Sequence, residues 1–419
     1  DVPGRPDAEL RVLGTRPVSE NAHDMRRRFV LSGFRTRSRR LHSGTALLAC
    51  ALFTAVACSS GGSSATSSSD SRPSITITPA SGNNVRPDTV VRVGIKHGLM
   101  DFVSVSDEHG SLIPGVYSAD HNSWSTRQLL EPATRYHVAV GADSKDQFWL
   151  KEADFRTVVP THKLKAKIAP LNGETVGVGM PIAVYFTAPV KNRAAVQKRF
   201  TVTADKAPAG AWHWFSDTEM HYRPPAYWPA HDHVTLRYDI NALDAGNGVW
   251  GVEGRTIAFD VGSSHIGKVD ARTHSMQVFV DGKLARTFDV STGRDKYPTT
   301  SGIHVVTNKN ADQIMDSSTI GIPRNAPGGY YLHVPNSVRI SYSGEFVHSA
   351  SWSVRDQGRR NVSHGCINVS PVNAKWFFDL TRRGDIVQVI GTPRRLQQGN
   401  GYADWNLSWS EWTSGDALR

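Results

Sequence analysis

The sequence predicts a mainly β protein: two immunoglobulin-like β-sandwiches, a third β-rich module with a short helix, and a Trp-rich C-terminal tail. Three observations support this. Between Ser74 and Gly262, short alternating runs of apolar and polar residues are broken by Gly, Pro, Asn and Asp. Related segments recur at a domain-sized period within that stretch. After Gly262, a hairpin signal and one capped helix replace the repeat.

Residues 25–58 carry the features of an export signal rather than of a folded domain, and residues 1–24 lack them. Seven Arg and no acidic residue lie between Met25 and Arg40, and the apolar run from Ala46 to Ala57 precedes Cys58. A cationic segment, a short apolar segment and a small-residue site are typical of a secretory signal. Residues 46–57 are too few to span a bilayer comfortably.

A lipid anchor is the favoured outcome of this signal. The tetrapeptide ending at Cys58 resembles the lipobox of bacterial lipoproteins, which implies lipidation of Cys58. Cys50 ends a second match, and a plain cleaved signal is a third possibility. The Ser/Gly run after Cys58 is typical of a flexible tether. We therefore expect an exported, membrane-anchored protein that faces the cell wall.

The formal net charge of +10 is concentrated in this signal, and no basic stripe follows it. We therefore expect no nucleic-acid partner.

The two sandwiches are predicted from an internal repeat. The segment Ile75 to Ile95 has a counterpart at Ala166 to Phe186, with Pro79 and Pro170 in matching positions. Roughly seven strands in each copy indicate immunoglobulin-like sandwiches. Their tryptophans are expected in cores or between modules, and His231 and His233 on a solvated strand face. With no catalytic constellation in them, the sandwiches are interpreted as spacers.

The third module has clear local signals. Residues 275–293 form a predicted hairpin whose turn is Asp281-Gly282. Residues 340–350 are predicted as one strand. Ser370 and Pro371 are typical of a helix N-cap and first helical position, with a short helix over 374–383 and a last strand over 385–390.

Cys366 is the candidate nucleophile. It is the only cysteine after the signal, it follows His364 and Gly365 in a loop ahead of the predicted helix, and His348 ends a nearby strand. A Cys–His pair with a third group orienting the His suits nucleophilic acyl transfer. An imidazolium or a helix N-terminus would lower the thiol pKa, and the N–H groups of Gly365 and Cys366 would form an oxyanion hole. A buried inert Cys and a metal site are the weaker alternatives.

These residues carry a resemblance. His348, a 14-residue spacer and then Ser363 to Asn368 (SHGCIN) resemble the signature of L,D-transpeptidases with a YkuD-type catalytic domain. IMDSST (314–319), SGEFVHSASWS (343–353) and the closing DWNLSWSEW (404–412) extend it. The two sandwiches and the Trp-rich tail are similar to mycobacterial-type members.

The resemblance implies a role for each matching residue. Cys366 would be the nucleophile, His348 the general base, and Ser349 the residue whose carbonyl orients that base. The residues matching the shell around the nucleophile are Ser363, His364, Gly365 and Asn368. Tyr330 matches an oxyanion-side lid tyrosine, and Met315 and Trp352 match substrate-cleft positions. Met315 and Trp352 as plain core, and Asn368 as a turn cap, remain alternatives.

The implied reaction is peptidoglycan cross-linking. Cys366 would attack the amide before the terminal D-Ala of a tetrapeptide stem, and an amine of an acceptor stem would resolve the thioester as a 3-3 cross-link. No cofactor or metal is expected, and carbapenem β-lactams are the implied inhibitors. Ile320 departs from the pattern, which has Tyr there. An L,D-carboxypeptidase and an inactive wall-binding lipoprotein are the alternative functions.

The predicted organisation follows from these signals. It comprises a non-native upstream extension (1–24), a lipoprotein-type signal (25–58), a tether (59–73), two immunoglobulin-like domains (74–160 and 161–262), the catalytic domain (263–392) and a C-terminal extension (393–419).

Overall fold

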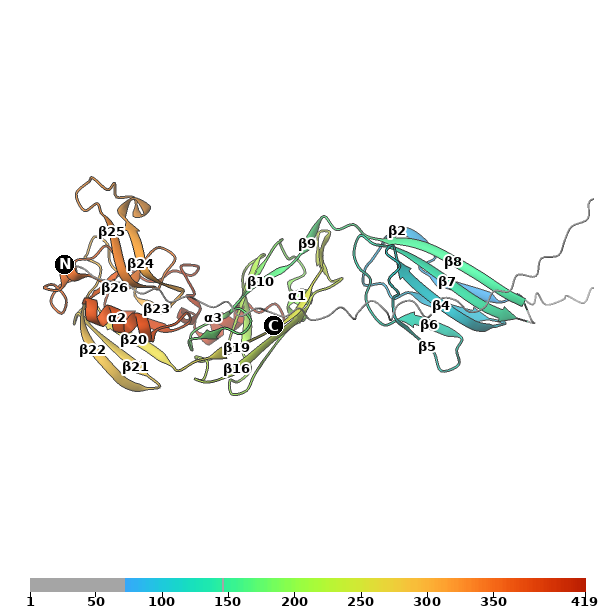
Figure 1. Cartoon of the computed structure of the whole chain (residues 1–419), viewed down its shortest axis with the longest axis horizontal. Coiled ribbons are helices and arrows are strands. Elements are labelled where there is room, and N and C mark those ends of the chain that lie inside the picture. Colours follow the sequence, from blue (N-terminus) through green and yellow to red (C-terminus); the bar gives the residue numbers. More distant parts are fainter. Residues whose placement is uncertain (1–71, 145–146) are drawn as a thin grey trace, which may run out of the picture. The chain divides into compact units, whose positions relative to one another are not determined.

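The computed structural model describes residues 72–144 and 147–419 (Figure 1). The predicted extension (1–24), the signal with its lipidated Cys58, and the tether up to residue 71 lie outside the described residues. Within the described ranges, no helix has the length and apolar character needed to cross a bilayer. The chain is mainly β, as predicted.

The first sandwich consists of two four-stranded sheets, ordered β1-β3-β6-β5 and β2-β8-β7-β4. Its strands are β1 (Ser74–Thr78), β2 (Ser81–Val85), β3 (Arg92–Lys96), β4 (Leu99–Asp107), β5 (Gly115–Tyr117), β6 (Ser123–Thr126), β7 (Arg135–Ser144) and β8 (Gln147–Thr157).

The second sandwich repeats this arrangement strand for strand, in the orders β10-β12-β15-β14 and β11-β19-β16-β13. In both copies the second strand pairs in parallel with the last, so the predicted repeat is confirmed, with eight strands rather than about seven. The strands are β10 (Ala166–Ala169), β11 (Thr175–Val176), β12 (Ile182–Phe186), β13 (Phe200–Ala204), β14 (Ala211–Ser216), β15 (Glu219–Arg223), β16 (His233–Asp239) and β19 (Gly254–Val261).

Short elements complete this module. A small sheet joins β17 (Asp244–Gly246), β18 (Val249–Gly251) and β9 (His162–Leu164), and α1 (Arg193–Gln197) precedes β13. One local prediction is wrong here: His231 is not in a strand but in a turn with φ of 59°, and β16 begins only at His233. Both imidazoles are exposed, as expected.

The third module is built on a nine-stranded sheet ordered β23-β28-β20-β21-β22-β27-β26-β25-β24. Its strands are β20 (His265–Asp270), β21 (Ser275–Val280), β22 (Lys283–Ser291), β23 (Gly302–Val305), β24 (Asn308–Asp316), β25 (Tyr331–Arg339), β26 (Phe346–Ser349), β27 (Ile367–Val369) and β28 (Ile386–Ile390). Its helices and those of the tail are η1 (Ser317–Ile320), η2 (Ser351–Ser353), α2 (Pro371–Leu380), η3 (Asp404–Asn406) and α3 (Trp409–Ser414).

Local signals in this module succeeded where a turn or cap fixed them. The hairpin is confirmed, with Asp281 and Gly282 both at positive φ in its turn. The Ser370 side chain caps α2 by accepting from the Asn373 N–H. The single strand predicted over 340–350 is wrong. A turn at 341–344 separates β25 from β26, because Gly344 adopts a φ of 96° that ends the extended backbone.

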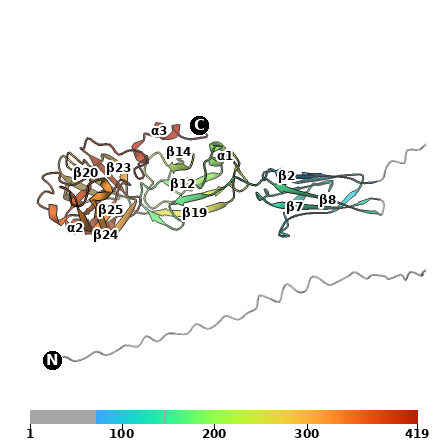
Figure 2. The ribbon, with the colours of Figure 1, turned by 90° about the horizontal axis from the view of Figure 1, so that it is seen from above.

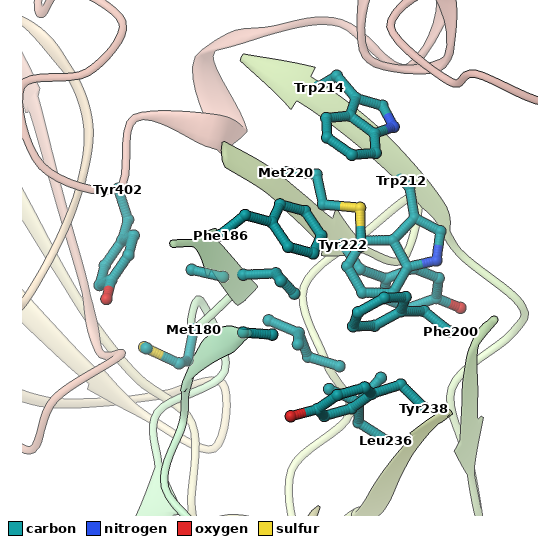
Figure 3. Close-up of a cluster of buried hydrophobic side chains, with 14 of the residues drawn as sticks. Met180, Phe186, Phe200, Trp212, Trp214, Met220, Tyr222, Leu236, Tyr238 and Tyr402 are labelled. Atoms are coloured by element: carbon teal, nitrogen blue, oxygen red, sulfur yellow. The ribbon is translucent and has the colours of Figure 1, made fainter. Parts of the chain in front are cut away.

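The second sandwich and the tail share one apolar core (Figure 3). Trp212, Trp214 and Trp228 are buried there with Trp405 of the tail, as the sequence predicted for the sandwich tryptophans. The Trp405 indole donates to the Gly179 carbonyl at 2.7 Å. Helix α3 lies against β14 (Figure 2), where the Trp412 indole donates to the Ala211 carbonyl at 2.9 Å. The tail thus packs on the neighbouring sandwich.

Candidate active site

Two adjacent strands bring the predicted nucleophile and base together. β26 and β27 pair in parallel, with His348 opposite Asn368, and Cys366 directly precedes β27. Side chains at facing positions of paired strands lie close together. His348 and the residues around Cys366, far apart in sequence, therefore come together near the start of β27.

A cavity of about 330 Å³ opens at this point. Eight of the ten predicted site residues line it: Met315, Tyr330, His348, Trp352, Ser363, His364, Cys366 and Asn368. The other two, Ser349 and Gly365, are buried beside it. Met315 is half-buried and Trp352 is 55% exposed, so neither belongs to the core.

His348 is held as a neutral imidazole with one defined tautomer. Its ring is 3% exposed, and Nδ1 lies 2.8 Å from the Ser349 carbonyl oxygen. A carbonyl only accepts, so Nδ1 carries the proton and Nε2 carries the lone pair. Burial lowers the pKa of His348 to about 4, against the smaller raising effect of that hydrogen bond. His348 therefore has the proton-accepting form of a general base at neutral pH.

Trp352 covers the same ring, since the two ring centroids are 6.0 Å apart with planes 30° from parallel. The indole thus shields the imidazole from water while leaving it on the cavity wall.

Cys366 rests as a neutral thiol. Its Sγ donates to the Gly344 carbonyl at 3.6 Å. Burial raises the thiol pKa to about 12, although the Phe346 N–H opposes this rise and the Glu345 carboxylate adds to it. The expectation of a lowered thiol pKa is therefore wrong. His348 is neutral, and β27 separates the thiol from the N-terminus of α2.

Three hydrogen bonds hold the loop that presents Cys366. The Gly365 N–H donates to Ser363 Oγ at 3.0 Å, and Ser363 Oγ donates to the Cys366 carbonyl at 2.6 Å. Thr299 Oγ1 donates to the Gly365 carbonyl at 2.7 Å. The Gly365 amide is therefore occupied, and the expectation that it serves in an oxyanion hole is wrong. Glycine is needed here because φ is 127°, a conformation that L side chains rarely adopt.

His364 lines the cavity, but the ring nitrogen that could accept a proton already accepts a hydrogen bond. Arg294 donates to His364 Nε2 at 2.6 Å. A guanidinium only donates, so Nε2 accepts and Nδ1 carries the proton. Burial and the Arg294 charge both lower the pKa of His364. This geometry leaves His364 without a nitrogen free to accept a proton, whereas Nε2 of His348 carries a lone pair.

The opposite wall comes from residues 316–331, here called the lid segment, and from the strands that flank it. Ser317 fixes Tyr330, because its Oγ accepts from the Tyr330 N–H at 2.9 Å. Burial, and then the negative charge that Cys366 would carry once ionised, raise the pKa of Tyr330 to about 12, so its hydroxyl stays a donor. Ile320 ends η1, is 39% exposed and lies outside the residues that line the cavity.

The sequence missed four supporting residues. Besides Arg294 and Thr299, the buried Glu345 carboxylate accepts from Thr300 N–H at 2.8 Å, and Ser353 Oγ accepts from the Asn368 side chain at 3.0 Å. The Asn368 side chain thereby links β27 to η2. This structural role is similar to the turn cap that was the alternative reading of Asn368. For Glu345 the sequence offered one signal, a charged residue next to Gly344 in a strand-like run. Arg294, Thr299 and Ser353 reach the site only through the tertiary fold.

In the part of the chain that the structure describes, no group of three or more His, Cys, Asp or Glu side chains is placed to hold a metal ion.

Two family models match the chain. Residues 82–244 match the bacterial Ig domain, and residues 264–389 match the L,D-transpeptidase catalytic domain. Among solved structures, that of LD transpeptidase LdtMt1 in complex with imipenem shares 36% sequence identity, covers 55% of this chain and 100% of its own, and has a TM-score of 0.48.

Curated relatives extend the likeness to nearly the whole chain. L,D-transpeptidase 2 of Mycobacterium tuberculosis is 35% identical over 395 residues, which are 91% of this chain and 97% of the relative. L,D-transpeptidase 5 of the same species is 32% identical over 83% of this chain and 77% of its own length. On this identity and coverage, together with the matching catalytic-domain model, the chain belongs to the L,D-transpeptidase family.

Proposed function

We propose that this enzyme forms 3-3 cross-links in peptidoglycan, with Cys366 as nucleophile and His348 as general base. The observation that carries the proposal is the pairing of a single thiol with a buried imidazole whose Nδ1–H is fixed on the Ser349 carbonyl, at the wall of one cavity. An oriented base beside a nucleophile is the arrangement that acyl transfer needs.

In the acylation step, the Cys366 thiol leaves the Gly344 carbonyl and gives its proton to His348 Nε2 as sulfur attacks the donor amide carbon. The carbon–nitrogen bond then breaks, and His348 returns the proton to the leaving D-Ala amine. A thioester on Cys366 remains. Because both groups are neutral at rest, proton transfer accompanies attack instead of preceding it.

In the second step, an amine of the acceptor stem attacks the thioester carbon and gives a proton to His348 Nε2. The carbon–sulfur bond breaks, and His348 reprotonates the departing thiolate. A new amide forms without any outside energy source, because the thioester conserved the energy of the original bond.

Side chains around the cavity supply binding and charge stabilisation. The Tyr330 hydroxyl and the Cys366 N–H are the donors we assign to the developing oxyanion, because the Gly365 amide is occupied. Ser363 and Asn368 hold the nucleophile loop and β27 in place. Met315 and Trp352 offer apolar surface to the donor stem.

We also propose that carbapenems acylate Cys366, since a strained β-lactam amide presents the same electrophilic carbon as the donor stem. Export and lipidation at Cys58 complete the proposal, placing the enzyme at the membrane facing the wall. The signal-like composition of residues 25–58 supports this placement.

The test is product analysis with a disaccharide-tetrapeptide as the sole substrate. The proposal predicts a cross-linked dimer whose mass equals two substrates minus one D-Ala, with none from Cys366→Ala. A tripeptide product without dimer would identify a carboxypeptidase. No product from the wild type would favour the inactive wall-binding lipoprotein.

A further inference from the structure

The outer face of one sheet in the first sandwich carries an apolar cluster that the catalytic account does not use. It consists of Leu99 and Phe102 on β4 and of Phe148 and Leu150 on β8, the two strands that flank β7 (Figure 1). Their exposed fractions are 73%, 36%, 56% and 55%. We call these four side chains the apolar face.

The two aromatic rings of the apolar face contact each other across β7, and the exposed Asp143 of β7 lies opposite Leu99 and Phe148 on the same face. The rings of Phe102 and Phe148 stack with centroids 6.5 Å apart. They cover Gly141 of β7, where an added Cβ would stand 2.4 Å from Phe102 and 2.9 Å from Phe148. Leu150 lies directly opposite Gly141 in the β7–β8 pairing. The absent side chain at position 141 thus seats two aromatic rings against the sheet.

The same sheet face changes character along its strands. Further along β7 and β8, His137 contacts Glu152 at 3.5 Å and Asp154 at 3.1 Å. Side chains at alternate positions of a strand share a face, so this charged group and the apolar face lie on one surface. One end of this face therefore carries the four apolar side chains with the single carboxylate of Asp143, and the other end carries the charged group.

The apolar end is the end at which the chain enters the sandwich. A Cβ added at Gly98, next to Leu99, would stand 2.9 Å from Pro73 Cβ and 3.0 Å from the Asp143 carbonyl. Pro73 precedes β1. Residues 59–73 connect Cys58 to this point, and that length of chain reaches at most about 50 Å. A lipid on Cys58 would hold the apolar end within that distance of the bilayer.

We propose that the apolar face docks on the lipid bilayer, inserting its four side chains into the interface. The proposal rests on the proposed Cys58 anchor, which makes docking intramolecular and lets a weak contact form. Asp143 lies within the face, and Lys96 and Asp101 lie at the same end, so the charge there is mixed and apolar burial carries the attachment. The first sandwich would then be a membrane foot for the catalytic module.

The test uses the whole lipidated chain, with Cys366→Ser, in vesicles of phosphatidylethanolamine and phosphatidylglycerol. An environment-sensitive dye is attached at Leu150→Cys. The matched control is Arg156→Cys, on the same face of β8 but six positions along, about 20 Å away. The parent without an added cysteine gives the background.

The proposal predicts that brominated lipids quench the dye at Leu150→Cys and leave the dye at Arg156→Cys unquenched. With the dye at Leu99→Cys, adding Phe148→Ser and Leu150→Ser lowers the ratio of docked to undocked chain by about tenfold per side chain removed. Circular dichroism checks that these surface variants remain folded.

Three results would overturn the proposal. If the chain floats with the vesicles but its Leu150→Cys dye is unquenched, the Cys58 anchor stands and the docking proposal is wrong. If the chain does not float, both the anchor and the docking are wrong. Dye self-quenching that needs no brominated lipid and grows with protein density would assign the face to a second copy of the chain.

Discussion

The two walls of the active-site cavity are built differently. The wall formed by β26, β27 and the loop before β27 is buried in its strands, partly buried in its loop and held by hydrogen bonds, with His348 fixed by Ser349 and Cys366 by Ser363. The wall formed by the lid segment and its flanking strands is more exposed. Met315 is half-buried there, and Ile320 stands outside the cavity.

This difference largely separates the residues that carry the chemistry from the residues that select the substrate. His348 and Cys366, whose protonation decides the reaction, lie in the hydrogen-bonded wall, and the lid wall adds one group to the chemistry, the Tyr330 hydroxyl assigned to the oxyanion. Groups that meet the substrate lie where substitutions leave the core intact. Changes in the buried wall should lower turnover by large factors, and changes in the lid wall other than at Tyr330 should alter binding by small ones.

The largest effect tests the base in the buried wall. His348→Ala should lower the rate of acylation about 10²–10⁴-fold, because the thiol loses its proton acceptor. His364→Ala is the matched control and should lower it about tenfold or less, since Arg294 occupies its Nε2. Stopped-flow acylation by a carbapenem measures both. Equal losses in the two variants would contradict the assignment of the base.

The second prediction tests the resting state of the same wall. Because the thiol pKa is raised to about 12, its thiolate fraction should grow tenfold per pH unit, and iodoacetamide should alkylate Cys366 about a hundredfold faster at pH 9 than at pH 7. His348→Ala should leave this slope unchanged, since the imidazole is neutral above its pKa of about 4. A plateau beginning near pH 6 would instead reveal a thiolate–imidazolium pair.

The third prediction loosens the buried wall without touching the reacting atoms. Ser363→Ala leaves the Gly365 N–H and the Cys366 carbonyl without their partner, which should cost about 1–3 kcal/mol of stability. Turnover should fall about tenfold with KM little changed. Ser363→Thr keeps the hydroxyl and serves as the control. Wild-type stability and turnover in Ser363→Ala would show that the clamp does not matter.

The smallest effect belongs to the lid wall. Ile320→Tyr restores the residue that the family pattern predicts, yet the position is exposed and outside the cavity. Stability should change by no more than about 0.5 kcal/mol, and carbapenem acylation by no more than about threefold. Met315→Ala, which removes a cavity-lining side chain, should raise donor KM by about tenfold. A larger effect from Ile320→Tyr would place that side chain over the substrate.

The sequence predicted what local signals determine. Turn and cap residues located the hairpin at Asp281 and the start of α2, and the internal repeat anticipated two sandwiches of matching topology. The alternation of residues 340–350 predicted one strand and missed the turn at Gly344. A single glycine in a strand-like run is compatible with both extended and positive φ, so the sequence does not locate the turn. Arg294 and Thr299 join the site through the tertiary fold, so no spacing reveals them. The raised thiol pKa depends on burial, which the sequence cannot supply.

The most direct test of the central claim is intact-mass spectrometry of the acyl-enzyme. Wild type and Cys366→Ala are incubated with a carbapenem, and the adduct is mapped by proteolysis. The account predicts one drug-sized adduct on the wild type, on the peptide that contains Cys366, and none on the variant. An adduct that persists in Cys366→Ala, or that maps to another residue, would contradict it.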